Sequence, residues 1–340
     1  MKLLIIGSKS IHLSSFIQAL NGQGIRPYFL AEEACDYSEV EKEFVVPFRS
    51  KNPSAVLSSN RQLKAILKDL KPDLVHVHQV NRLAYFATRH CDRLNIPCLT
   101  TAWGSDVLVI PQQNSFFKFL VKKTLQRSKL ITADSQEMID SMQKIVPSSD
   151  RYTLLQYGID LIDAVEKEKI IYSNRLHKPI YRIDQIIRYF EDIEKDHTDW
   201  RLVIGAVGVE TDNLKALVIE KGLENRVDFV GWLEKEDNHA WYAKSSIYIS
   251  IPEHDGTAVS LLEAMSAGCV PIVPDLVVSK EWITDGINGV IEKSPNNPIR
   301  RALEIDASVC AKTNRKLVEE KAGRTNCTKQ FIELYNRVKS

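Results

Sequence analysis

Short apolar runs alternate along this chain with longer segments in which apolar residues recur every three or four positions. The runs predict buried β-strands, and the longer segments predict amphipathic helices. In the first half the pattern begins with a strand at Lys2–Ile6 and a helix at Leu13–Asn21. It continues with strands at Pro27–Ala31, Asp73–His78, Pro97–Thr101 and Lys129–Ala133, and with helices at Asn60–Leu70, Asn81–Leu94, Phe116–Gln126 and Ser135–Val146.

The same alternation resumes after a polar stretch, Asp163–Lys169, which we interpret as a linker. It predicts α/β domains, each with a parallel sheet covered by helices on both faces and with ligands at the carboxyl ends of the strands. A length of 340 residues favours two such domains. The later strands are expected at Ile170–Ser173, Arg201–Ile204, Val227–Val230, Ser246–Ile251 and Cys269–Pro274, and the later helices at Ile183–Lys195, Thr211–Lys221, Asn238–Ala243, Val259–Met265 and Cys327–Val338.

Composition and charge exclude several classes of protein. The chain has 45 Lys and Arg against 44 Asp and Glu, so its overall charge predicts no nucleic-acid partner. No segment approaches the roughly 20 apolar residues of a membrane span, and the apolar start is too short for a signal peptide, so we expect a cytoplasmic protein. The six cysteines lack C-x-x-C spacing, which predicts neither a disulfide framework nor a zinc site.

The segment from Glu253 to Gly268 carries the most specific chemistry of the chain. A buried strand precedes a short turn, Asp255–Thr257, and the helix that follows ends at Gly268, in the position of a C-terminal cap. Free backbone N–H groups at such a helix start bind anions. Asp255 and Glu263 stand eight positions apart in this segment. The arrangement suits a molecule that carries both a phosphate and hydroxyl groups.

This segment resembles the acidic motif of the retaining GT-B glycosyltransferases of family 4, in which E-x(7)-E lies inside E-G-[FT]-x-x-x-x-L-E-A-M-A-x-G. Glu263 matches the second acid, which in the family binds the ribose of the nucleotide sugar. Asp255 stands in place of the first Glu, and Glu253 is the other candidate for that role. The resemblance implies that Gly256, Thr257, Ala258 and Val259 hold the diphosphate. The alternative is a doubly wound protein with acids on an exposed helix face.

The resemblance covers nearly the whole chain and implies an α/β GT-B fold, with two Rossmann-like domains whose parallel sheets face a cleft. Gln156–Asp160 is similar to the Asn-Gly-Ile-Asp that ends the first domain in the family. By this analogy, residues 1–160 bind the acceptor and residues 161–326 bind the nucleotide sugar. The last helix, within residues 327–340, would pack back on the first domain.

A second motif, Asn174–Lys178, resembles the family's Gly-Arg-Leu…Lys-Gly, whose Arg and Lys clamp the donor diphosphate. Arg175 matches the Arg. Lys178 lies three positions after Arg175 rather than five, so Tyr181 or Arg182 is an alternative for the Lys position. Fixed cations there would stabilise the charge that grows on the leaving diphosphate. The alternative is an ordinary loop with surface cations.

Three features of the first half of the chain are candidates for contacts with the leaving phosphate, the donor sugar or the acceptor. The loop that starts at Gly7 follows the first strand, where the family faces the leaving phosphate, and His12 either contacts the acceptor or starts the next helix. His76 and His78 alternate along one strand, and His78 lies at its carboxyl end, either in the site or as a satisfied structural histidine.

Thr101–Asp106 resembles the family's His-Gly-x-Asp loop, with Trp103 in place of the His. Trp103 would stack on a sugar ring, and Asp106 would either accept from an acceptor hydroxyl or cap the loop. Residues 115–127 combine Phe and Lys at helical spacing. They form either a surface for anionic membranes, as in many relatives, or a helix that packs its Phe and Leu on the sheet.

The sequence therefore predicts a retaining hexosyltransferase that moves a hexose or N-acetylhexosamine from a nucleoside diphosphate sugar, expected to be UDP-linked, to a saccharide or lipid-linked acceptor. We expect a role in cell-surface polysaccharide or glycolipid biosynthesis, with no cofactor and no metal, since no D-x-D pair marks a metal site. Catalytic roles would fall to Arg175, Lys178, Asp255, Glu263 and His78, and the donor site would include Gly7 and Trp103. The alternatives are a nucleotide-sugar epimerase, a sugar phosphorylase and a non-catalytic sugar-nucleotide-binding protein.

Overall fold

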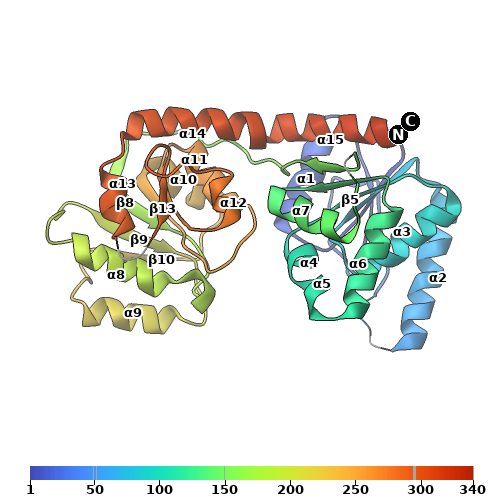
Figure 1. The fold of residues 1–340 in the computed structure, drawn as a ribbon, viewed down its shortest axis with the longest axis horizontal. Helices are drawn as coiled ribbons and strands as arrows, with labels where there is room; N and C mark the ends of the chain where they lie inside the picture. Colours follow the sequence, from blue (N-terminus) through green and yellow to red (C-terminus); the bar gives the residue numbers. More distant parts are fainter. Residues whose placement is uncertain (49, 51, 149, 294–295, 340) are drawn as a thin grey trace. The chain divides into compact units, whose positions relative to one another are not determined.

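The computed structural model describes residues 1–48, 50, 52–148, 150–293 and 296–339. The chain forms two compact units, drawn in Figure 1. Unit 1 comprises Met1–Gly158 and Arg324–Ser340, and unit 2 comprises Ile159–Gly323. Over the described residues, no helix combines the length and the apolar character needed to cross a bilayer.

Unit 1 is built on a parallel sheet with the strand order β3-β2-β1-β4-β5-β6-β7. Adjacent residues of its central strands face opposite sides: Leu3 and Ile5 pack in one core, and Leu4 and Ile6 pack in the other. Burial on both sides is the reason why these strands read as continuous apolar runs. The strands are β1 Leu3–Ile6, β2 Tyr28–Ala31, β3 Lys42–Val45, β4 Leu74–His78, β5 Cys98–Thr101, β6 Leu130–Ala133 and β7 Tyr152–Leu154.

Helices cover both faces of this sheet. α15, from Arg324 to Lys339, lies in the same core as α1, where Phe331 contacts Phe16 with ring centroids 4.8 Å apart. The two ends of the chain thus share one unit. The other helices of unit 1 are α1 Ile11–Gly22, α2 Pro53–Leu70, α3 Arg82–Leu94, α4 Ser105–Leu108, α5 Ile110–Gln113, α6 Ser115–Arg127 and α7 Gln136–Ile145.

Unit 2 repeats the arrangement with the strand order β10-β9-β8-β11-β12-β13, again parallel. The strands are β8 Glu168–Ser173, β9 Arg201–Gly205, β10 Val227–Gly231, β11 Ser245–Ile249, β12 Val270–Pro274 and β13 Val290–Glu292. The helices are η1 Pro179–Tyr181 (a 3₁₀ turn), α8 Ile183–Ile193, α9 Thr211–Glu220, α10 Lys235–Lys244, α11 Val259–Ser266, α12 Val277–Lys280, α13 Pro298–Leu303 and α14 Ala307–Ala322.

The strand order fixes where each unit can hold a ligand. In both sheets the first strand lies between the second and the fourth. The direction in which successive strands are added to the sheet therefore reverses at the β1/β4 pair and at the β8/β11 pair, while the strands stay parallel. Ligands of doubly wound sheets bind at such switch points, outside the carboxyl ends of the strands. The predicted α/β architecture with two Rossmann-like halves is confirmed.

The structure corrects the sequence prediction in two places. β3, β7 and β13 lie at sheet edges and were not predicted. The short helices α4, α5, η1, α12 and α13 and the longer helix α14 were not predicted either. The interpretation of Asp163–Lys169 as a linker is wrong, because the segment lies inside unit 2 and runs into β8. Within it, the Lys167 ammonium donates to the carbonyls of Tyr242 and Ala267, at the ends of α10 and α11, at 3.1 and 2.7 Å.

Candidate active site

The switch point of unit 2 brings a cation and an acid together from two neighbouring strands. Arg175 follows β8 and Asp255 follows β11, and their Nη2 and Oδ2 atoms lie 2.8 Å apart. The guanidinium also stacks on the Tyr181 ring, 4.4 Å from its centroid. The exposed fractions of the two side chains are only 13% and 28%, so the pair is well shielded from water. Sequence reasoning placed both residues at this site, and the structure joins them directly.

The environment keeps Arg175 charged. Burial alone would lower its pKa, but the neighbouring Tyr248 hydroxyl and then the Asp255 carboxylate raise it, and the net pKa lies above the ordinary value. Arg175 Nη1 also donates to Ser260 Oγ, in the first turn of α11, at 3.3 Å. A permanent positive charge therefore stands beside the start of this helix.

The start of α11 has the features of an anion site. Ala258 is the N-cap residue of the helix and makes no side-chain cap hydrogen bond to its first N–H groups. Asp255 shapes the turn by accepting from the Gly256 N–H through Oδ1 at 3.0 Å. Gly256, Thr257 and Ala258 line a small hollow beside this turn. Uncapped N–H groups, the helix dipole and a nearby guanidinium together favour a bound diphosphate.

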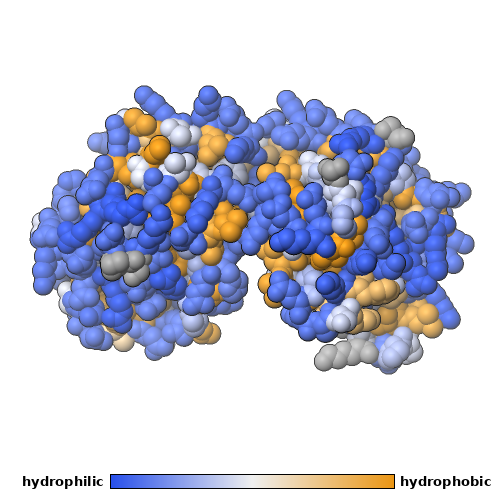
Figure 2. Space-filling view, viewed as in Figure 1, coloured by the Kyte–Doolittle hydropathy of each residue, from blue (hydrophilic) through white to orange (hydrophobic). Residues whose placement is uncertain are grey.

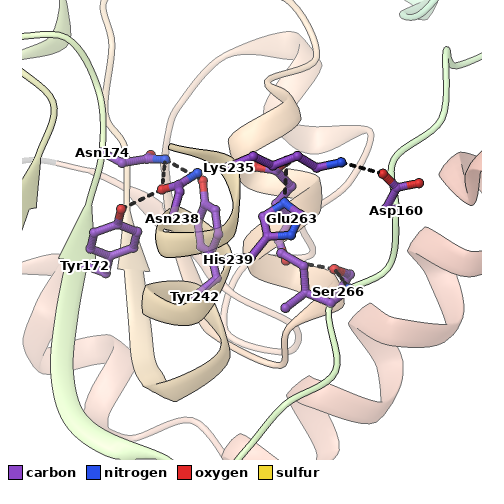
Figure 3. A network of polar contacts seen from close by, with 10 residues as sticks. Asp160, Tyr172, Asn174, Lys235, Asn238, His239, Tyr242, Glu263 and Ser266 are labelled. Atoms are coloured by element: carbon purple, nitrogen blue, oxygen red, sulfur yellow. Dashed lines mark hydrogen bonds and ion pairs between the residues drawn. The ribbon is translucent and has the colours of Figure 1, made fainter. Parts of the chain in front are cut away.

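Glu263 lies one turn further along α11 and faces α10. Its Oε1 is 3.5 Å from His239 Nε2, and Figure 3 shows the two side chains pointing toward each other. The exposed fractions are 16% for Glu263 and 22% for His239, but the His239 Nε2 atom that faces Glu263 is itself buried. Ser266 fixes the end of α11 because its hydroxyl donates to the Glu263 carbonyl at 2.8 Å and accepts from the Ile162 N–H at 3.1 Å.

Lys178 and Glu253 occupy a separate pocket of about 370 Å³, which is also lined by Arg182 and Glu210. Lys178 is exposed at the start of η1. The two acids weighed for the donor sugar thus diverge: Asp255 joins Arg175, whereas Glu253 shares a pocket with Lys178.

The alternatives for the second cation position also resolve into distinct contacts. Arg182 donates through Nη1 and Nη2 to the two carboxylate oxygens of Glu292, at 3.2 and 3.1 Å. Tyr181 supplies the ring under the Arg175 guanidinium rather than a positive charge.

The switch point of unit 1 is aromatic and buried. A Cβ on Gly7 would lie 3.2 Å from His78 Cβ and 2.6 Å from the Leu13 side chain, so a larger residue here would have to displace the Leu13 side chain. His78 Nδ1 lies 3.0 Å from the Tyr157 hydroxyl, and the Trp103 ring meets the His78 ring edge-on at 6.3 Å. Burial lowers the pKa of His78 to about 3, so the ring is neutral at physiological pH.

Two other polar candidates of unit 1 have structural contacts. His76 lies fully buried between Tyr335 and Thr101, at 2.8 and 2.7 Å. Asp106 caps its own loop by accepting from the Val80 and Trp103 N–H groups at 2.7 and 3.0 Å.

The cap of α1 is Ser10, whose hydroxyl accepts from the Leu13 N–H at 3.1 Å. His12 is exposed in the first turn.

α6 has both of the faces that its sequence suggested. Val121, Thr124 and Leu125 are buried against the sheet, whereas Phe116 and Phe119 are 63% and 47% exposed. Figure 2 shows hydrophobic surface on unit 1 in the region where Figure 1 draws α5 and α6.

Unit 1 carries 24 Lys and Arg against 15 Asp and Glu, a formal charge of +9, whereas unit 2 carries 21 against 29, a formal charge of −8. The near-neutral total concealed this asymmetry.

Sequence reasoning missed the contribution of α10. Lys235, Asn238, His239 and Tyr242 recur at intervals of three and four and therefore share one helix face. Figure 3 shows that this face looks toward Glu263 and Asn174. The spacing was the available signal, but the helix was predicted only over Asn238–Ala243, so its polar face was not recognised.

Two family models match the chain. One, described as glycosyl transferases group 1, matches residues 161–321, and one described as glycosyl transferase 4-like matches residues 2–135.

Curated relatives match shorter stretches. The chain is 27% identical over 214 residues to the lipopolysaccharide core biosynthesis mannosyltransferase LpcC of Rhizobium leguminosarum bv. viciae. The matched stretch covers 55% of this chain and 60% of that protein. It is 24% identical over 206 residues to the O-antigen chain mannosyltransferase RfbU of Salmonella typhimurium, covering 58% of this chain and 57% of that protein. The match thus spans less than two thirds of either relative.

Among solved structures, Anabaena Alr3699/HepE in complex with UDP has a TM-score of 0.82 over 99% of this chain and 100% of that chain, at 13% identity. This likeness establishes the shared fold. Together with the two family models, which match most of the chain, it shows that the chain belongs to the GT-B glycosyltransferases of the family 4-like type.

Proposed function

We propose that this protein transfers a hexose or N-acetylhexosamine from a nucleoside diphosphate sugar to an acceptor hydroxyl, with retention of configuration at the anomeric carbon. The observation that carries the proposal is the Arg175–Asp255 pair at the uncapped start of α11. Glu263, one turn along the same helix, would accept from the ribose hydroxyls. The donor would thus bind to unit 2, with its diphosphate at the helix start.

The chemistry follows from where charge appears. When the bond between the sugar and the diphosphate breaks, negative charge grows on the leaving phosphate oxygens. Arg175 and the N–H groups of residues 256–259 would stabilise that charge more strongly in the transition state than in the ground state. No carboxylate is assigned as a nucleophile, so we propose a front-face displacement in which the leaving phosphate assists the attacking hydroxyl. We expect no metal or cofactor to be needed.

The donor and the acceptor are the finer parts of the proposal. We propose a UDP-sugar, in keeping with the UDP bound to the similar Anabaena structure. The relatives LpcC and RfbU are named mannosyltransferases of lipopolysaccharide core and O-antigen synthesis, which favours a saccharide or lipid-linked acceptor of a surface polysaccharide. Unit 1 would bind this acceptor near His78 and Trp103. The exposed Phe and Lys side chains of α6 would bring the protein, from the cytoplasm, into peripheral contact with an anionic membrane.

A panel of nucleotide sugars tests the proposal by thermal shift. UDP-glucose, UDP-galactose, their N-acetylamino counterparts and GDP-mannose would be compared with UDP and GDP. A ligand at about 100 times its Kd adds about 2.7 kcal/mol to stability, which gives a clear rise in Tm. We expect at least one nucleotide sugar to raise Tm in wild type and not in Arg175→Ala. A panel that leaves Tm unchanged would contradict the proposal.

Slow hydrolysis then separates an enzyme from a binding protein. A retaining transferase without acceptor is expected to release free sugar from its donor slowly, with water in place of the acceptor. Chromatography of the stabilising nucleotide sugar after long incubation would detect this. Binding without any hydrolysis, and without transfer to a lipid-linked acceptor extract, would favour the non-catalytic alternative.

A further inference from the structure

The ribose end and the diphosphate end of the proposed donor site share one partly buried hydrogen-bond network. Asn174, directly before Arg175, donates through Nδ2 to Asn238 Oδ1 at 2.9 Å and to the Tyr242 hydroxyl at 2.7 Å. Its Oδ1 accepts from the Tyr248 hydroxyl at 3.2 Å. Asn238 also accepts from the Tyr172 hydroxyl at 2.6 Å, as Figure 3 shows. We call Asn174, Asn238 and these three tyrosines the amide hub.

The tyrosines keep the amide hub in a single arrangement. Tyr172, Tyr242 and Tyr248 are all fully buried, and burial raises the pKa of each, so their hydroxyls stay protonated and can donate or accept. A buried polar group that loses its partner costs about 1–3 kcal/mol. The network therefore has a strong preference for staying complete, and it holds α10 in register with the end of β8.

Asn174 occupies a position where the Gly-Arg-Leu motif, which this loop resembles, has no side chain. Asn238 is the neighbour of His239 in sequence, and Asn174 is the neighbour of Arg175. A change in the amide hub would thus be transmitted to both charged ends of the site. The extra amide suggests that this chain has a positioning device that the motif itself lacks.

His239 is the group that the amide hub presents to Glu263. Its Nε2 lies 3.5 Å from one carboxylate oxygen, Oε1, while both side chains remain partly exposed. Apo contacts of this kind are often long and shorten when the ligand binds. A carboxylate held at one oxygen keeps its other oxygen free, and it loses less conformational freedom when it accepts from a hydroxyl pair.

We propose that His239 is a positioning residue for nucleotide recognition. His239 orients Glu263 toward the ribose 2′- and 3′-hydroxyls, and the amide hub holds His239 in place. The proposal rests on the proposed function, since it assumes that the nucleotide binds at α11. It adds a role in selecting ribonucleotides for residues outside both sequence motifs.

The test compares nucleotides with and without ribose hydroxyls. Calorimetry would measure the Kd of UDP and GDP, and of their 2′,3′-dideoxy forms, for wild type, His239→Ala and His239→Gln. We expect His239→Ala to weaken binding of the preferred ribonucleotide about tenfold, the scale of one hydrogen bond to a charged group, and to leave the dideoxy form within about twofold. His239→Gln, which keeps an N–H donor, is expected to recover most of the affinity.

Two further variants separate positioning from general damage. Adding His239→Ala to Glu263→Ala is expected to cause no further loss, because the His acts through the Glu. Asn174→Gly, which restores the residue of the resembled motif, is expected to reduce ribonucleotide selectivity in the same direction. His197→Ala, a partly exposed histidine beyond the end of α8, is the matched control and should change neither Kd.

The outcomes are distinct. Equal losses for ribo- and dideoxynucleotides, or additive losses in the double variant, would overturn the role of His239 while leaving the proposed function intact. Failure of wild type to bind any of the four nucleotides would overturn the proposed function itself, and this inference with it.

Discussion

The two units share a topology but use their switch points differently. In unit 2, the loops after β8 and β11 place a guanidinium and a carboxylate 2.8 Å apart, with Glu263 and His239 close by and partly exposed. In unit 1, the loops after β1 and β4 enclose His78, which is buried and neutral between aromatic rings. The switch point of unit 2 therefore presents charged side chains, whereas that of unit 1 presents apolar side chains and neutral hydrogen-bonding groups.

The difference shows that the net charge of a unit does not locate its charged site. Unit 2 has a formal charge of −8, yet it places a permanent cation beside the uncapped start of α11. Unit 1 has a formal charge of +9, but the switch-point residues named above carry none of it. A diphosphate suits the first environment, and a sugar ring that stacks on an aromatic face suits the second.

The largest expected effect is on turnover, at Arg175. We expect Arg175→Ala to reduce kcat about a hundredfold or more, the scale of losing one group that stabilises developing charge. Arg175→Lys should recover only part of this, because an ammonium cannot reproduce the bidentate fork. Steady-state kinetics with the best donor of the panel provides the measurement.

Lys178→Ala serves as the comparison for Arg175→Ala, because Lys178 is exposed and lines the separate pocket. It should change kcat less than Arg175→Ala does. If Lys178→Ala proves the more damaging change and Arg175→Ala is nearly silent, the cation that acts on the diphosphate has been assigned to the wrong pocket.

The next effect concerns the positive charge of unit 1. Changing Lys118, Lys122 and Lys123 of α6 to Glu should abolish co-sedimentation with anionic vesicles, because each Lys near such a surface contributes about 1 kcal/mol. The matched control makes the same charge change on unit 2, at the exposed residues Lys195, Lys312 and Lys316. Wild-type protein that never pellets, or a control that loses binding equally, would leave α6 with a packing role alone.

The third effect is on nucleotide affinity, at Glu263. Glu263→Ala should weaken binding of the preferred nucleotide by about 1.5–3 kcal/mol, the range for a hydrogen bond to a charged group. Calorimetry on a variant with a native circular dichroism spectrum would measure it. An unchanged affinity would remove Glu263 from the ribose contact, and would weaken the contrast between the two switch points.

The last effect is a pH dependence of stability that the buried histidines of unit 1 impart. The pKa of His78 is lowered by burial from 6.5 to about 3, and the pKa of His76 is also lowered by burial. The unfolded chain therefore binds protons that the folded chain does not, and stability falls as pH drops from about 6.5 toward 3. Each such His contributes a slope of about 1.4 kcal/mol per pH unit in that window.

Urea unfolding at pH 7 and pH 5 would measure this slope. His78→Gln should flatten it by up to one histidine's share, whereas His197→Gln, at a partly exposed position, should not. Equal slopes in wild type and His78→Gln would show that the ring titrates normally, and so is not sealed among the aromatic side chains.

The sequence predicted the central strands well because they are buried on both faces and read as apolar runs. It did not predict β3 or β7, because edge strands such as Lys42–Val45 are half exposed and mix polar with apolar residues. α14 was not predicted because its buried face is only weakly apolar. This face consists of Cys310, Asn314, Val318 and Ala322, and Asn314 forms hydrogen bonds with Asn288 rather than packing as an apolar residue.

The residues of the candidate site also differ in whether the sequence could reveal them. Arg175, Asp255 and Glu263 were found because each sits in a contiguous motif that can be recognised along the chain. His239 and Asn174 were not found as functional candidates, because their importance arises from contacts between α10, α11 and the end of β8. Such contacts join residues 24 and 64 positions apart in the sequence, a separation that local patterns do not record.

Hydrogen exchange with and without UDP, read by mass spectrometry, tests most directly whether unit 2 carries the nucleotide site. Amides that gain a ligand exchange more slowly, so protection maps the binding surface. We expect the strongest protection on residues 174–181, 235–242 and 256–263, and a smaller effect in Glu263→Ala. Protection concentrated instead on the loops of Gly7, His78 and Trp103, with unit 2 unchanged, would show that the nucleotide binds to unit 1.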